Sequence, residues 1–65
     1  MSAHTSSSLG VAGLESVYDA LAEAIDQAGP DKAPLFLVKL ALLNAQALGD
    51  AKRTREQIEA ALLDL

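Results

Sequence analysis

Hydrophobic residues in the stretch 35–48 fall on nearly every side of the helix that this stretch predicts. Its sequence is LFLVKLALLNAQAL, with Lys39 as its one charged residue. A helix that is apolar all round has to be covered by protein or to lie in a membrane. A stretch of this length, interrupted by a lysine, falls short of the roughly 18 apolar residues that indicate a spanning helix. We therefore expect a core helix at about residues 32–48.

Amphipathic helices are predicted on both sides of this stretch. In residues 14–28, apolar side chains recur at every third or fourth position, and acidic side chains gather on the opposite side. Residues 51–64 show the same spacing. The positions of this third helix that are predicted to face inward are Ala51, Thr54, Ile58, Ala61 and Leu62, with Leu65 beyond them. Gly29-Pro30 and Gly49-Asp50 separate the three helices, because glycine suits the left-handed position after a helix and proline cannot continue one.

The start of the third helix has two interpretations. Asp50 is a good N-cap for a helix that begins at residue 51. Alternatively, Thr54 and Gln57 form a capping box, which would leave residues 50–53 as a loop. The beginning of the chain shows no such pattern, because residues 1–13 are rich in serine and glycine and have no apolar period. The fold class that we predict is all-α, a compact bundle of three short helices with a disordered N-terminal arm.

Composition limits how such a bundle can be stabilised. The chain has 65 residues and no cysteine, which excludes a disulfide and a thiolate metal site. A domain of this size buries only about 60% of the surface that its unfolded chain exposes, so good helix packing or oligomerisation has to supply stability. The net charge of −4 argues against general affinity for nucleic acid or anionic membranes. Residues 1–13 lack the pattern of a secretory signal, and we expect a cytoplasmic protein.

Three segments together resemble a known family. They are residues 17–21 (VYDAL), residues 37–50 (LVKLALLNAQALGD) and residues 58–61 (IEAA). This pattern of an aromatic residue before a leucine, a leucine-rich helix that ends in Gly-Asp, and a final Ile-x-x-Ala helix resembles a small bacterial family of stand-alone helical proteins of unknown function. The resemblance covers about residues 14–62. It implies an all-α fold and assigns no site residues.

No group of residues indicates catalysis. His4 is the one histidine and lies in the predicted tail with Ser6, Ser7 and Ser8, where nothing would hold a base beside a nucleophile. We therefore predict a non-enzymatic protein without a cofactor, a metal or a small-molecule ligand. Glu15, Asp19 and Glu23 share one helical face; no loop supplies the further oxygen ligands that a hard cation needs. This face is expected to be solvated or to bind a basic partner.

A candidate basic patch lies at the start of the third helix. Lys52, Arg53 and Arg55 follow a turn that contains glycine, as in the recognition helix of a helix-turn-helix DNA-binding protein. Cations at a helix N-terminus oppose the helix dipole, so the patch also suits an acidic protein surface, such as the first helix of this chain or of a second one. DNA binding is the alternative function.

The candidate partner interface follows from an excess of apolar surface over the helices available to cover it. Leu35 and Leu42 lie beside the polar line of the second helix, and Leu63 lies on the polar side of the third. An apolar patch of these three residues would mark a binding site. Asn44 lies between the two apolar faces of the second helix and is predicted to have a structural role, since an amide that is buried and paired can fix the register between helices; the pattern leaves open whether Asn44 is buried. We expect a protein-protein interaction module, either a homodimer or an accessory subunit.

Overall fold

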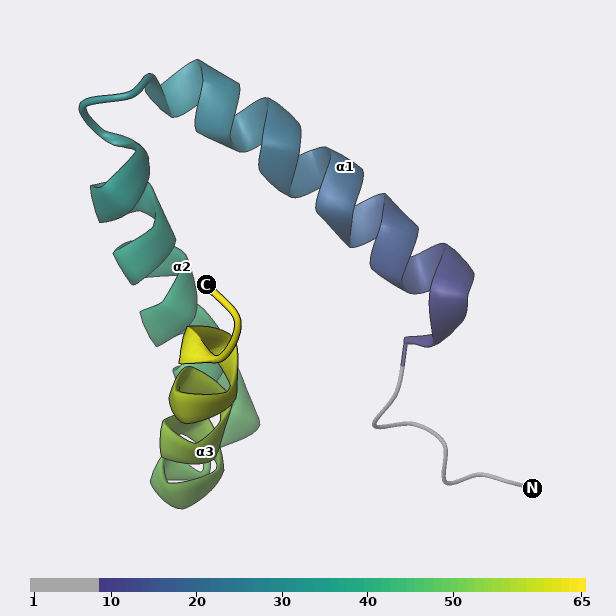
Figure 1. Ribbon diagram of the computed structural model, residues 1–65, viewed down its shortest axis with the longest axis vertical. Coiled ribbons are helices and arrows are strands. Elements are labelled where there is room, and N and C mark those ends of the chain that lie inside the picture. Colours follow the sequence, from purple (N-terminus) through teal and green to yellow (C-terminus); the bar gives the residue numbers. More distant parts are fainter. Residues whose placement is uncertain (1–8) are drawn as a thin grey trace. The chain divides into compact units, whose positions relative to one another are not determined.

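The described part of the chain, residues 9–65 of a computed structural model, consists of three α-helices (Figure 1). Helix α1 spans Gly10–Ala28, α2 spans Ala33–Leu48 and α3 spans Ala51–Leu62. No strand occurs in these residues. The all-α class and the three helices are therefore confirmed. Most of the predicted N-terminal arm, residues 1–8, lies outside the described residues.

The chain divides into two units. The first unit ends at Ala33 and contains α1, whereas the second unit, Pro34–Leu65, contains α2 and α3. The two units differ in charge. The first has five acidic residues and one lysine, a net charge of −4, and the second has four acidic and four basic residues and is neutral. All of the net charge of the protein therefore belongs to the unit that contains α1.

Helix α1 begins at Gly10, within the segment that the sequence analysis assigned to the tail. Val11 explains the difference, because it extends the apolar repeat of Leu14 and Tyr18 by one turn toward the N-terminus. Gly13 does not interrupt the helix. The Leu9 side chain lies over it, since a Cβ built on Gly13 would be 3.1 Å from the Cβ of Leu9. Glycines weakened the helical signal here without ending the helix.

Backbone hydrogen bonds fix the turn between α1 and α2. Gly29 has a φ of 83°, in the left-handed region that glycine enters without a steric cost. Its N–H donates to the carbonyl of Ile25 at 3.0 Å, which ends α1. Its carbonyl accepts from the N–H groups of Lys32 at 3.1 Å and Ala33 at 2.9 Å. One residue thus satisfies backbone groups of both helix ends.

The turn between α2 and α3 contains only Gly49 and Asp50. Gly49 has a φ of 72°, and its N–H donates to the carbonyl of Ala45 at 2.9 Å. Asp50 is extended, with φ −146° and ψ 100°, and its carboxylate accepts from the N–H of Arg53 at 3.0 Å. This geometry confirms Asp50 as the N-cap. The alternative of a late start at the Thr54 capping box is wrong, because α3 begins at Ala51.

Within residues 9–65, no side chain is fully buried. The most covered large apolar residues are Leu21 and Ile25 in the first unit, and Phe36 and Leu40 in the second, and all four are only half-buried. The predicted core position of α2 therefore needs correction, because this single chain does not bury the helix. An apolar pattern on every side shows that a helix needs cover. It does not show whether the same chain provides that cover.

We predict that Gly49→Ala lowers the helical content of the protein, because an L side chain in the left-handed region costs about 1 kcal/mol or more. Gly49→Asn should lose less, since asparagine tolerates this conformation better than alanine does. Circular dichroism during thermal unfolding measures the difference. Equal melting curves for the alanine variant and the parent would show that the turn does not limit the stability of α2 and α3.

Candidate protein interaction surface

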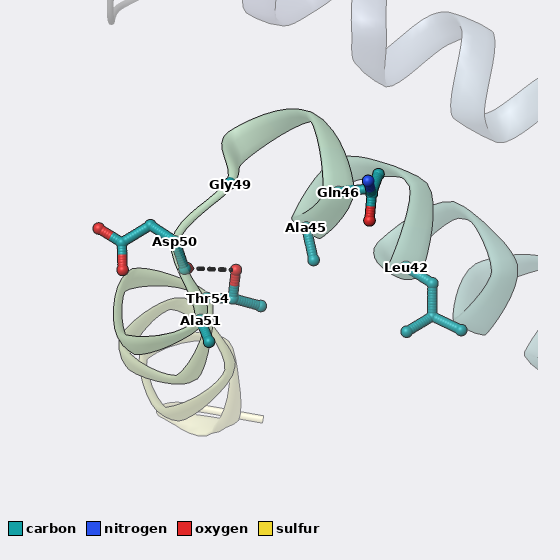
Figure 2. A pocket seen from close by; sticks show the side chains of 7 residues that line it. All are labelled: Leu42, Ala45, Gln46, Gly49, Asp50, Ala51 and Thr54. Atoms are coloured by element: carbon teal, nitrogen blue, oxygen red, sulfur yellow. Dashed lines mark hydrogen bonds between the residues drawn. The ribbon is translucent and has the colours of Figure 1, made fainter.

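An open hollow lies in the corner between α2 and α3 (Figure 2). Its volume is about 420 Å³. Seven residues line it: Leu42, Ala45, Gln46, Gly49, Asp50, Ala51 and Thr54. Figure 2 shows the hollow beside the turn at Gly49 and Asp50, which joins the end of α2 to the start of α3.

Small side chains make this corner. Ala45 on α2 and Ala51 on α3 are small and leave the hollow open, whereas a Cβ at Gly49 would meet no atom within 4 Å, so this glycine is needed for its positive φ and not for a close approach. Thr54 contributes little free polarity, because its Oγ1 donates to the Asp50 carbonyl at 3.0 Å. The hollow is therefore lined more by apolar than by polar atoms, and the Asp50 carboxylate points away from the other lining residues (Figure 2).

Exposed apolar residues continue from the hollow along both helices. On α2, Leu35, Val38 and Leu42 recur every third or fourth residue, so they share one face. On α3, Ile58 and Leu62 follow Ala51 and Thr54 with the same spacing. The two rows meet at the hollow, which Leu42, Ala51 and Thr54 line together. We call the following residues the corner stripe: Leu35, Val38, Leu42, Ala51, Ile58 and Leu62.

The three candidate interface leucines are all exposed, but they lie at different places in the second unit. Leu35 and Leu42 are 61% and 66% exposed and both belong to the corner stripe. Leu63 is also exposed, but it is the C-cap of α3 and does not line the hollow. The sequence places Val38, Ile58 and Leu62 in a core, whereas all three are exposed in the structure. Their spacing relative to Leu35 and Leu42 was the signal that could have identified them.

The candidate basic patch is solvent-accessible. Lys52, Arg53 and Arg55 are all exposed at the start of α3. The N-terminus of this helix already holds an anion, however, because the Asp50 carboxylate accepts from the Arg53 N–H. A phosphate at this helix end would have to approach that carboxylate. The helix also has no acidic residue in its first turn and no basic residue in its last, which is opposite to the order that the helix dipole favours.

The acidic face of α1 lies beside an exposed apolar surface. Val11, Leu14 and Tyr18 are all exposed on this helix, and Glu15 and Asp19 lie next to them. The predicted acidic residues Glu15, Asp19 and Glu23 are all exposed. In the described part of the chain, no group of three His, Cys, Asp or Glu residues could hold a metal ion.

The remaining polar candidates do not form a site. His4 and Ser6–Ser8 lie outside the described residues. Asn44 is exposed on α2, so within residues 9–65 it is not a buried amide that could fix helix register. A residue between two apolar faces is buried only when both of these faces are covered, and in this chain they are not.

Comparisons with known proteins give no relative. No protein-family model, curated protein or solved structure matches the chain. The resemblance to a small bacterial helical family therefore stays a prediction. Among residues 9–65, none of the helices has both the length and the hydropathy to cross a bilayer.

We predict that Asp50→Ala destabilises α3 by about 0.5–2 kcal/mol, because it removes the acceptor for the Arg53 N–H. Asp50→Asn is the matched control, since asparagine is an equally good N-cap without the charge. Circular dichroism and the backbone amide chemical shifts of residues 51–55 report the effect. If the asparagine variant unfolds as readily as the alanine variant, the carboxylate charge matters and the capping hydrogen bond does not.

Proposed function

We propose that this protein is a non-catalytic interaction module that forms a homodimer through the corner stripe. One observation supports the proposal most directly. None of the residues 9–65 is buried, and fifteen large hydrophobic side chains among them are exposed to solvent. Ten of them belong to the second unit, where the corner stripe gathers exposed apolar residues of α2 and α3 around one hollow, and an exposed apolar patch of this kind marks binding sites in small proteins. No arrangement of the described residues favours an enzymatic function over this one.

The physical argument concerns stability. Removal of apolar surface from water is the dominant favourable contribution to folding, and single chains of this size are marginally stable even with a core. Here the half-buried residues of each unit are few. Burial against a partner adds the missing contribution, and it makes stability depend on protein concentration. A symmetric dimer is the commonest closed assembly that provides such burial.

We predict that sedimentation equilibrium across a concentration series gives a mass that rises from one chain toward two. The thermal midpoint should rise with concentration in the same range, because association stabilises the folded chain. A monomeric mass at every concentration, together with a well-folded chain, contradicts the homodimer and transfers the proposal to an accessory subunit with a different protein partner.

We predict that Leu42→Glu prevents this association and leaves helical chains, because it places a carboxylate in the hollow of the corner stripe. Leu9→Glu is the matched control. Leu9 is 62% exposed, close to the 66% of Leu42, and it lies outside the helices and the second unit. The control should retain the mass of the parent. Loss of dimer in both variants would show that added charge, and not the position on the stripe, controls association.

The exposed basic patch favours DNA binding as a second candidate function. Binding through Lys52, Arg53 and Arg55 would weaken steeply with salt, since each phosphate contact releases counterions. We expect this protein to bind protein and not DNA, and therefore expect no gel shift of duplex DNA at low salt. A salt-sensitive shift that Arg55→Glu abolishes would reverse this ranking.

A further inference from the structure

The charges of α3 are ordered along the helix. Lys52, Arg53 and Arg55 occupy its start, and Glu56 and Glu59 follow, with Asp64 just beyond its end. The helix dipole favours the reverse order, with acidic residues at the N-terminus and basic residues at the C-terminus. Within α3, the opposite charges of Lys52 and Glu56 and of Arg55 and Glu59 are spaced i, i+4 and attract each other weakly, and the Asp50 carboxylate caps the N-terminus, but neither restores the order that the dipole favours. A sequence that departs from a local rule in this way indicates a functional constraint.

An antiparallel second copy of α3 would compensate for it. The basic start of one helix would lie beside the acidic end of the other, and beside the negative end of its dipole. The same match would occur twice, because a two-fold axis makes the contact self-complementary. A parallel pair would instead place the three cations of one copy beside the three cations of the other.

The net charges of the two units also favour a dimer contact through α2 and α3 over one through α1. The four acidic residues of α1 have no basic residue among them, so two copies of this helix repel each other. The second unit is neutral, and α2 contributes a single charge, Lys39. A second copy therefore meets no net repulsion on the unit that contains the corner stripe.

We propose that the occupant of the α2–α3 corner is α3 of a second copy of this chain, which lies antiparallel to the first α3 and against the corner stripe. This rests on the homodimer proposed above and adds its orientation and its recognition code. Ile58, near the middle of α3, lies close to the two-fold axis. Leu35, Val38 and Leu42 of one copy cover the apolar face of α3 of the other copy. The charges on either side of Ile58 select the antiparallel alignment.

Charge exchange tests the alignment. The half-exchange variant carries Glu56→Lys and Glu59→Lys. Its α3 is basic throughout most of its length, and the net charge of the chain changes from −4 to zero. Nonspecific repulsion decreases, yet we expect the dimer dissociation constant to rise about tenfold or more, because like charges now face each other. Added lysines toward the C-terminus suit the helix dipole, but they also turn the attractive i, i+4 pairs of residues 52 and 56 and of residues 55 and 59 into repulsive ones. Circular dichroism therefore has to show that α3 of this variant remains helical before the loss is assigned to the dimer contact.

The full-exchange variant adds Lys52→Glu and Arg55→Glu to the same chain. Its net charge equals that of the parent, and an acidic start now faces a basic end. We expect its dissociation constant to return to within about threefold of the parent value, since the opposite charges are again complementary. It should not form mixed dimers with the parent, whose charges it repels.

Two negative results are distinguishable. A parent chain that remains monomeric in sedimentation equilibrium refutes the homodimer itself. A parent chain that dimerises, with a half-exchange variant that associates as tightly as the parent, leaves the homodimer in place and overturns the antiparallel α3 alignment.

Discussion

The two-residue connection at Gly49 and Asp50 is the constraint on which the second unit depends. Its left-handed glycine ends α2, and its extended aspartate starts α3 at once. No spare residue remains to adjust the direction of the second helix, so the relative direction of α2 and α3 follows from two backbone conformations. The hydrogen bonds of Ala45, Asp50, Arg53 and Thr54 around this turn satisfy backbone groups that the helix ends would otherwise leave free. The open hollow is a consequence of this short turn between small side chains.

A helix pair of this kind cannot provide its own core. Each fully buried leucine contributes about 1.5–3 kcal/mol of stabilisation, but the leucines of the corner stripe remain mostly in water. The helices therefore depend on capping and local backbone bonds, which contribute about 0.5–2 kcal/mol per cap. These contributions are small beside the conformational entropy of about 1–2 kcal/mol that each ordered residue loses. Association is expected to add to the stability of helices that already form in the single chain, and a residue of the corner stripe then affects stability and binding together.

The sequence predicts those features of this structure that depend on neighbouring residues. The three helices, the turn at Gly49 and the cap at Asp50 could all be identified from spacing and from turn chemistry. The start of α1 was misplaced because Gly10 and Gly13 were interpreted as a flexible segment, although Val11 and Leu14 continued the repeat. The burial of α2 and of Asn44 could not be predicted, because burial depends on which surfaces meet in space. Leu35 and Leu42 were identified as exposed, whereas Val38 and Ile58 were assigned to a core that this chain alone does not form.

Hydrophobic pattern and charge pattern answer different questions about this protein. The apolar face of a helix shows that it needs a neighbour, and many neighbours would satisfy that need because burial is not directional. Charges are directional along a helix, so their order can select one neighbour and one alignment. In α3, the order costs the isolated helix some stability because it opposes the dipole. A stabilising partner has to present the complementary order, and the same helix in reverse direction is one that the chain itself always supplies.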